Sequence, residues 1–172
     1  VAADACLVAR DATGRSKVVL VETLNPQVRQ VVKTYALGFG LEVVEVQHRG
    51  GVTDPEELSA AAAGAAAVLF QQPNFLGALE PAPDLAEAAN EAGALAIVHV
   101  DPMSLGVLEA PGAYGAAIAI GEGQAAGNWP SYGGPHYGFL AARNDFIRRM
   151  PGRIVGETVD ADGRRAFVLT LQ

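Results

Sequence analysis

The residues of this sequence that could do chemistry follow its apolar runs. Asp101 comes directly after the run from Leu95 to Val100. A carboxylate in that place could hold a ligand cation, such as a protonated pyridine nitrogen, or it could cap the turn ahead of Pro102. Turn capping is the more common role of such a residue. Both interpretations stay open on the sequence alone.

A stretch from Gly115 to Gly138 begins with the apolar run Ala116 to Ile120 and continues as a glycine-rich loop. A loop of this length persists in a compact domain mainly when it has a function. Gln124 stands where an enzyme that uses pyridoxal phosphate would carry the lysine that forms an imine with the cofactor. The sequence has only two lysines, Lys17 and Lys33, and neither follows the end of a predicted strand. We therefore expect no covalent cofactor on this chain and no catalytic residue of its own.

Weaker candidates stand in this loop and in an earlier one. Asn74 and His136 flank predicted strand ends and are further candidates for cofactor binding, where they could also hydrogen-bond a substrate carboxylate or a partner chain. An Asn after proline, however, is usually a turn former. A lone histidine is likewise more often structural than catalytic. An exposed Trp129 would suit an interface, and packing against the domain is equally consistent with its place. The candidate interface residues of the loop are Trp129, Tyr132, Gly133, Gly134 and His136.

The glycine spacing from Gly121 to Gly127 superficially matches a dinucleotide-binding fingerprint. Such a fingerprint follows the first strand and opens a helix, so that the pyrophosphate meets the amide dipoles. Here Trp129-Pro130 and Gly133-Gly134-Pro135 follow, and these residues predict no helix. A small-molecule binding domain of Rossmann type is kept as an alternative. Another alternative is a non-enzymatic scaffold that binds a second chain through its sheet edge and glycine loop.

Composition limits the classes of partner. The chain has 172 residues, of which 18% are charged, and a formal net charge of −7, which argues against nucleic acid or an anionic membrane as partner. Its apolar runs are too short to span a bilayer and no leader is recognised, so we expect a soluble, cytoplasmic protein. Cys6 is expected to be a packed thiol. The three histidines lie far apart in the sequence, which predicts no metal site.

The pattern of apolar residues predicts strands that alternate with helices. We expect helices over 1–12, from Pro26 to Gly38 or Gly40, over 53–64, over 83–92 and from 144 or 145 to 150, and strands over 17–21, 41–46, 65–70, 95–100, from 116 and from 137. The Asp-Gly pair within 160–163 predicts a β-hairpin between 153–159 and 165–171. This alternation is typical of a three-layer α/β fold with a mostly parallel sheet. Ligands of such sheets bind beyond the carboxyl ends of the strands, where Asp101, Asn74 and Gln124 are expected.

Several motifs together resemble one family, that of glycine dehydrogenase (decarboxylating) subunit 1, the P-protein of the glycine cleavage system. The matching stretches cover essentially the whole chain. They are Leu24–Gln27 with Arg29–Tyr35, Gln72–Gly77, Asp101–Gly106, Pro111–Ala116, Gly121–Gln124, Gly133–Phe139, Met150–Asp160 and Phe167–Gln172. The resemblance implies the large domain of aspartate aminotransferase-like (fold type I) pyridoxal phosphate enzymes. It also implies that residues 1–172 are a single-domain fragment, with a βα core over 1–152 and a hairpin over 153–172.

The resemblance further implies an enzyme of two kinds of subunit. The complete enzyme would decarboxylate glycine and pass the aminomethyl group to the lipoyl arm of the H-protein. Its pyridoxal phosphate would be held by the lysine of sister subunit 2, with Gln124 at the equivalent place here and Asp101 as a vestigial partner of the pyridine nitrogen. We therefore expect a supporting subunit, inactive as an isolated fragment, whose loop from Trp129 to His136 reaches a neighbouring active site.

Overall fold

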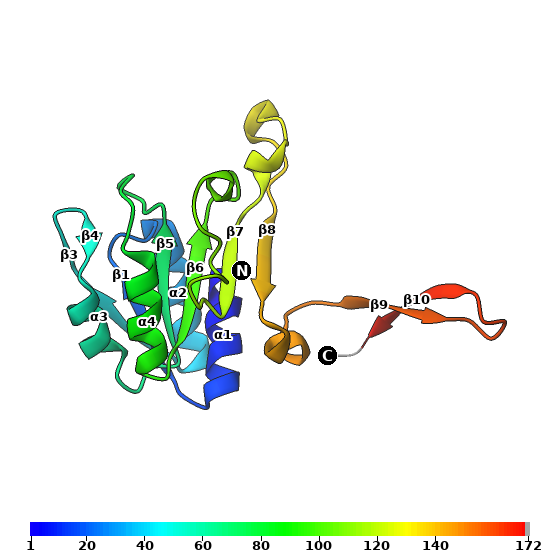
Figure 1. Ribbon diagram of the computed structural model, residues 1–172, viewed down its shortest axis with the longest axis horizontal. Coiled ribbons are helices and arrows are strands. Elements are labelled where there is room, and N and C mark those ends of the chain that lie inside the picture. Colours follow the sequence, from blue (N-terminus) through cyan, green and yellow to red (C-terminus); the bar gives the residue numbers. More distant parts are fainter. Residues whose placement is uncertain (171–172) are drawn as a thin grey trace.

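The computed structural model describes residues 1–170, which form a six-stranded sheet between two layers of helices (Figure 1). The strand order is β2-β1-β5-β6-β7-β8, and all neighbours are parallel except β8, which runs antiparallel to β7. The mostly parallel α/β sheet predicted from the sequence is thus confirmed. The strands are β1 (Lys17–Val21), β2 (Glu42–Val46), β5 (Ala67–Gln72), β6 (Leu95–Val100), β7 (Ile118–Glu122) and β8 (Gly138–Ala142).

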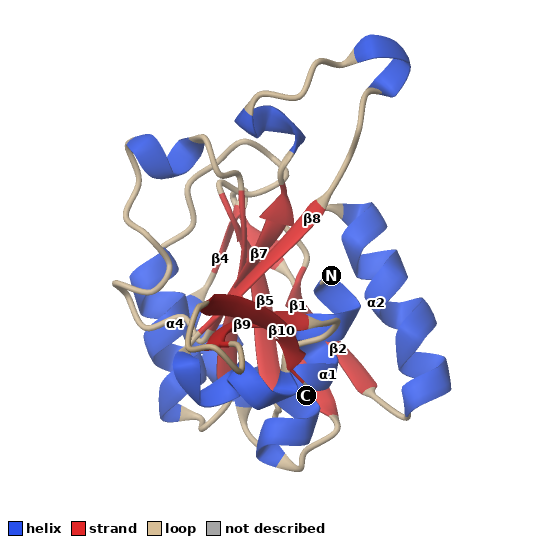
Figure 2. Cartoon of the chain, turned by 90° about the vertical axis from the view of Figure 1, so that its right-hand side faces the viewer, coloured by secondary structure: helices blue, strands red, loops and turns tan. Residues whose placement is uncertain are grey.

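Four α-helices cover the two faces of the sheet. They are α1 (Ala2–Thr13), α2 (Pro26–Phe39), α3 (Pro55–Ala62) and α4 (Ala82–Glu91). Helix α1 packs beside α2 and α3 packs beside α4, and α4 lies across the sheet from α1 and α2 (Figure 2). The central strands are apolar and buried along most of their length because helices cover them on both sides, and their polar residues lie near their carboxyl ends. Cys6 on α1 belongs to this core and is fully buried.

The sequence explains where the helices begin and end. The side chains of Asn25 and Asp54 accept hydrogen bonds from the backbone N–H groups of Gln27 and Glu56, each at 2.9 Å, and a proline follows each cap. Helix α2 ends at Gly40, whose φ of 65° is in the left-handed region that glycine adopts most easily. These signals place α2 where the sequence predicts it.

One connection differs from the sequence-based prediction. The spacing of Thr53 and Glu56 predicts Thr53 as the cap of α3, but the structure uses Asp54. Thr53 instead belongs to a small hairpin of β3 (His48–Arg49) and β4 (Val52–Thr53), which the sequence analysis missed. The physical reason is a long-range contact, because the Thr53 hydroxyl and N–H both donate to the carboxylate of Glu80.

Two segments extend beyond this α/β body (Figure 1). The first is the glycine-rich loop between β7 and β8, which contains two short 3₁₀ turns, η2 (Gln124–Ala126) and η3 (Ser131–Gly133). The second follows the 3₁₀ segment η4 (Asn144–Arg149) and is a hairpin of β9 (Ile154–Val159) and β10 (Arg165–Thr170). The hairpin forms where the sequence predicts it, although Leu171 of the predicted strand and Gln172 lie outside the described residues. Across residues 1–170, every helix is too short or too polar to cross a bilayer.

Candidate functional site

The carboxyl ends of β1, β5, β6 and β7 meet at one edge of the sheet, which we call the carboxyl edge. A cavity of about 260 Å³ opens there between the ends of β5, β6 and β7. It is lined by Gln71, His99, Val100, Asp101, Glu122 and Ala125. The structure therefore brings Asp101 close to the start of the glycine-rich loop, as the topology of a parallel sheet requires.

Asp101 caps a turn at this edge. Its Oδ1 accepts a hydrogen bond from the N–H of Met103 at 3.0 Å, and its backbone oxygen accepts one from the hydroxyl of Ser104 at 2.7 Å. The side chain is exposed and borders the cavity. Asp101 therefore caps this turn, which is one of the two roles considered for it, and its contact with a ligand cation stays a prediction.

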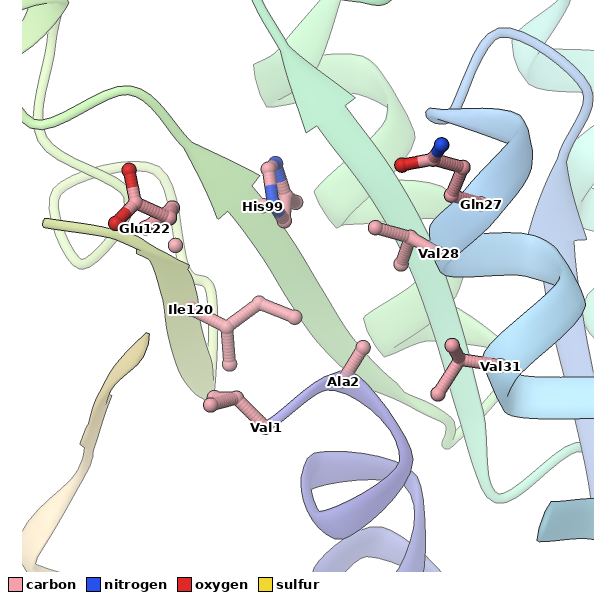
Figure 3. Close-up of a pocket in the computed structure, with 9 residues that line it drawn as sticks. Val1, Ala2, Gln27, Val28, Val31, His99, Ile120 and Glu122 are labelled. Carbon is pink, nitrogen blue, oxygen red and sulfur yellow. The ribbon is translucent and has the colours of Figure 1, made fainter. Parts of the chain in front are cut away.

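His99 connects this cavity with a second one of about 250 Å³ on the side of the sheet covered by α1 and α2. Val28, Val31 and Ile120 supply apolar walls of the second cavity. Its polar side chains are those of Gln27, His99 and Glu122 (Figure 3). Nδ1 of His99 is buried without a hydrogen-bond partner among residues 1–170. Burial lowers the pKa of His99, which favours the neutral imidazole at pH 7.

The sequence predicts no metal-binding role for His99, and no sequence motif places this residue at the site. The position of His99 in β6 is the feature from which its place at the site could have been predicted. Side chains alternate along a strand, so a histidine two residues before Asp101 lies on the same side of β6 as that residue and near the same end. Among the described residues, no cluster of metal-ligating side chains includes it.

Gln124 holds the glycine-rich loop together. Its Nε2 donates to the backbone oxygen of Gly133 at 2.7 Å, and its N–H donates to Oε1 of Glu122 at 2.9 Å. The same carboxylate oxygen accepts the N–H of Tyr137 at 3.3 Å and lies 3.6 Å from Nδ1 of His136. Glu122, for which the sequence predicted no role, therefore joins both ends of the loop.

The outer part of the loop presents aromatic side chains to solvent. Trp129 is 81% exposed, and Tyr132 is fully exposed with a φ of 51°, an uncommon conformation for a residue with a side chain. Gly134 also has a positive φ, and a Cβ there would collide with the backbone oxygen of Trp129. The loop therefore has a defined conformation, and a larger residue in place of Gly134 would disturb it.

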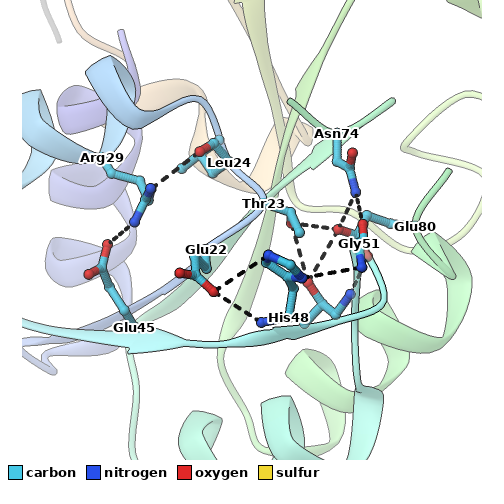
Figure 4. A network of polar contacts seen from close by, with 10 residues as sticks. Glu22, Thr23, Leu24, Arg29, Glu45, His48, Gly51, Asn74 and Glu80 are labelled. Carbon is cyan, nitrogen blue, oxygen red and sulfur yellow. Dashed lines mark hydrogen bonds and ion pairs between the residues drawn. The ribbon is translucent and has the colours of Figure 1, made fainter. Parts of the chain in front are cut away.

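Asn74 lies in a different environment, within a buried polar network (Figure 4). Its Nδ2 donates to the oxygen of Gly51 at 2.8 Å and to Oε1 of Glu80 at 2.9 Å, and its Oδ1 accepts the N–H groups of Leu76 and Ala78 at 3.0 Å. All the usual bonds of the amide are thus made within the chain. These contacts give Asn74 a structural role, and its binding of a cofactor stays a prediction.

Both lysines lie away from the carboxyl edge. Lys17 opens β1 at the opposite end of the strand, and its Nζ donates to the backbone oxygen of Ala63. Lys33 is on α2 and forms an ion pair with Glu45 at 2.8 Å. The glycine spacing at 121–127 does not open an α-helix either, because it contains only the three-residue 3₁₀ turn η2. That geometry lacks the helix N-terminus that a dinucleotide-binding fingerprint requires.

Comparison with solved structures defines the class of fold. The chain matches a cysteine desulfurase from Thermococcus onnurineus with a TM-score of 0.71 at 21% identity, over 99% of this chain and 42% of the other. It matches an aspartate aminotransferase from Thermus thermophilus with a TM-score of 0.62 at 24% identity, over 86% of this chain and 41% of the other. The chain therefore has the fold of the fold type I pyridoxal phosphate-dependent enzymes.

Closer relatives define the family. The family model described as "Glycine cleavage system P-protein" matches residues 1–172. A crystal structure of glycine decarboxylase (P-protein) of the glycine cleavage system, in inhibitor-bound form, superposes with a TM-score of 0.90 at 47% identity, over 99% of this chain and 38% of the other. This chain belongs to the glycine cleavage system P-protein family.

The curated relatives carry the name of one subunit. The protein named "Probable glycine dehydrogenase (decarboxylating) subunit 1" is 52% identical in Moorella thermoacetica over 171 residues. The protein of the same name in Thermococcus kodakarensis is 49% identical over 174 residues. Each match covers 99% of this chain, but the chain spans only 38% and 39% of the length of these relatives.

The residues at the carboxyl edge fit pyridoxal phosphate only in part. Asp101 offers a carboxylate near a cavity, as a pyridine nitrogen would require. Gln124 occupies the loop after β7 with an amide that is bonded to Gly133, and neither lysine of the chain lies at this edge. The described residues therefore do not provide the amine that would attach the cofactor covalently.

Proposed function

We propose that this chain is part of subunit 1 of a two-subunit glycine cleavage P-protein and acts there as a supporting subunit. The complete enzyme would decarboxylate glycine and transfer the aminomethyl group to the lipoyl arm of the H-protein. Pyridoxal phosphate would reside on sister subunit 2, which would supply the lysine. The name of the relatives and their identity to this chain support this assignment. Such an enzyme would work in the cytoplasm.

The observation that carries the proposal is the architecture of the loop after β7. In this proposal Gln124 corresponds to the position of the lysine, and its side chain closes the loop by donating a hydrogen bond to the oxygen of Gly133. The loop keeps its shape through Glu122 and through Gly134, and it exposes Trp129 at its outer part. A site without the amine but with an ordered, protruding loop is suited to positioning groups of a neighbouring chain.

The loop from Trp129 to His136 is the part proposed to reach the neighbouring active site. Its aromatic side chains are large, rigid and exposed, and such side chains contribute strongly to interfaces. His136 is exposed next to Glu122, so it could also present a proton donor or acceptor there. These residues would orient the sister subunit's site and exclude water from it, while the bond-breaking groups would belong to the sister subunit.

A change at the loop tip tests the proposal in the assembled enzyme. Trp129→Ala should lower the rate of glycine decarboxylation in the complex of full-length subunit 1 with subunit 2. The thermal unfolding of subunit 1 should stay unchanged, because 81% of the Trp129 side chain is exposed. Leu37→Ala on α2 is a matched control, because Leu37 is 90% exposed and distant from the loop in the fold. Full activity of the Trp129 variant would reject the proposed role of the loop.

A separate measurement tests the cofactor assignment. Full-length subunits 1 and 2 are mixed with pyridoxal phosphate, reduced with borohydride and separated. The pyridoxyl group that borohydride fixes to a lysine is expected on subunit 2. A stable label on residues 1–172, at Lys17 or Lys33, would contradict the inference that this part of the chain supports the site without holding the cofactor covalently.

A further inference from the structure

The base of the glycine-rich loop is closed by one carboxylate. Glu122 is the last residue of β7 and pairs with Gly138, the first residue of β8 on the other side of the loop. Its Oε1 accepts the N–H groups of Gln124 at 2.9 Å and of Tyr137 at 3.3 Å, one from each side of the loop. The N–H of Gly123 also donates to the oxygen of Tyr137 at 2.8 Å. The position of the outer loop therefore depends on how firmly this base is held.

The same carboxylate faces a histidine. Nδ1 of His136 lies 3.6 Å from Oε1 of Glu122. This distance is too long for a hydrogen bond, so the attraction between the two side chains depends on a positive charge on the imidazole ring. A histidine side chain changes its charge between pH 5 and 8, whereas glutamate side chains titrate below this range. The contact should therefore be strong at the acidic end of the range and weak at the alkaline end.

The other titratable groups near this pair do not change their charge in the same range. Residues 123–137 contain no Asp, Glu, Lys or Arg, and tyrosine side chains titrate near pH 10. From the end of β6, His99 and Asp101 line a cavity together with Glu122. Burial lowers the pKa of His99 and favours its neutral form, and aspartate side chains titrate below pH 5. His136 is therefore the group through which a change near neutral pH reaches the base of the loop.

The outer loop is braced within itself. Nε2 of Gln124 donates to the oxygen of Gly133 at 2.7 Å, and Nδ2 of Asn128 donates to the oxygen of Pro135 at 3.3 Å. Both bonds join one side of the loop to the other, beyond the point at which it leaves β7 and β8 (Figure 1). A segment braced in this way moves as one body, so a change at its base also displaces the exposed Trp129.

We propose that Glu122 is the positioning residue of the glycine-rich loop and that protonated His136 strengthens its hold, so that the loop is held more firmly at pH 6 than at pH 8. The two side chains are 46% and 62% exposed, and a pair of this kind shifts the opening equilibrium of the loop base by about two- to fivefold. The effect on the loop belongs to this chain alone. Its consequence for glycine decarboxylation rests on the proposed function, in which the loop reaches the neighbouring site.

Hydrogen exchange of full-length subunit 1 tests the effect of pH. The reporter is the N–H of Gln124, which donates to Glu122 and lies 12 positions from His136 in the sequence. It should exchange about two- to fivefold more slowly in the wild type than in His136→Gln at pH 6, and at the same rate in both at pH 8. Comparing two proteins at one pH cancels the effect of pH on the chemistry of exchange. Equal rates at pH 6 would overturn the proposal.

A second substitution separates the ion pair from the backbone contacts. In Glu122→Gln the amide oxygen can still accept the N–H groups of Gln124 and Tyr137, but the side chain has no charge. Adding His136→Gln to this variant should therefore change the exchange of the Gln124 amide at neither pH. Glu91→Gln removes an exposed carboxylate from α4 and is the matched control, in which the effect of His136→Gln should remain. An equal effect of His136→Gln with and without the charge of Glu122 would overturn the proposed pairing.

The assembled enzyme shows whether this hold on the loop matters for the reaction. Glu122→Ala removes the acceptor of both N–H groups, so it should lower the rate of glycine decarboxylation about fivefold or more, and Glu122→Gln, which keeps an acceptor, should retain most of the rate. Faster exchange of the Gln124 amide in Glu122→Ala with an unchanged rate of decarboxylation would reject the proposed reach of the loop, while the hold of Glu122 on the loop would stand. Unchanged exchange of the Gln124 amide in Glu122→Ala would overturn that hold itself.

Discussion

Glu80 organises the loops of the carboxyl edge, and its replacement is the sharpest test of the structure. Its side chain is only 4% exposed and lies in the polar network of Figure 4. Oε1 accepts hydrogen bonds from the hydroxyl of Thr23 at 2.5 Å, from Nδ2 of Asn74 at 2.9 Å and from the hydroxyl of Thr53 at 3.2 Å. Oε2 accepts the N–H of Thr53 at 2.8 Å. One carboxylate thus connects the segments after β1 and β5 with the β3–β4 hairpin.

Glu80→Gln changes the chemistry of this centre with almost no change of shape. The new NH₂ group must replace one carboxylate oxygen, and it then faces either the N–H of Thr53 or the amide of Asn74, both of which are donors. At least one buried donor loses its acceptor in either orientation. An unsatisfied buried donor costs about 1–3 kcal/mol, and the loss of a charged acceptor adds to this cost.

Two measurements on the full-length subunit check this prediction. The free energy of unfolding should fall by about 1–3 kcal/mol, and the amide of Thr53 should exchange about 5- to 150-fold faster. Glu87→Gln is the matched control, because Glu87 is an exposed carboxylate on α4 and its change should stay within about 0.5 kcal/mol. If Glu80→Gln unfolds like the wild type and the Thr53 amide keeps its exchange rate, the carboxylate does not organise these loops.

Three further predictions follow from single side chains. Partial burial opposes the ionisation of Glu45, but hydrogen bonds from Lys33 and Arg29 outweigh this effect and lower its pKa. Denaturant titrations should therefore show the wild type to be more stable than Glu45→Gln at pH 7, and this advantage should be lost as the pH falls below about 4. Burial raises the pKa of Cys6 to about 12, so a thiol reagent at pH 8 should modify it only after unfolding; rapid modification of the folded protein would contradict its placement. Gly134→Ala should change the fluorescence of Trp129, the single tryptophan of residues 1–172, when these residues are studied alone, whereas equal spectra would refute the tight packing there.

The elements that the sequence predicts correctly depend on local signals. Helix α2 follows from Asn25-Pro26 and from its ending glycine, and the central strands follow from continuous apolar runs. The β3–β4 hairpin was missed because its strands have two residues each, too few for any periodic pattern. Thr53 was assigned to the helix cap because the competing contact with Glu80 joins residues 27 positions apart.

Part of the candidate site could be predicted from the sequence, and part of it could not. The rule that ligands bind at the carboxyl ends of parallel strands placed Asp101 and Gln124 at the right edge. No role was predicted for Glu122, although it lies in the motif Gly121–Gln124, and none was predicted for His99, which belongs to no motif. Their importance comes from tertiary contacts, since Glu122 joins two ends of a loop and His99 lines both cavities.

Polar side chains at the carboxyl edge differ in how their hydrogen bonds are used, and this difference bears on the proposed role. Asn74, Glu80 and Gln124 use their hydrogen bonds within and between the loops of this chain. A reacting group must instead keep an atom free for its substrate. Within residues 1–170, only His99 has a buried ring nitrogen without a partner at this edge, and its low pKa favours the neutral form. Such an edge fixes the shape of its loops more than it offers reactive groups, so displacing the loop should harm the complete enzyme more than removing any single polar atom of the cavity.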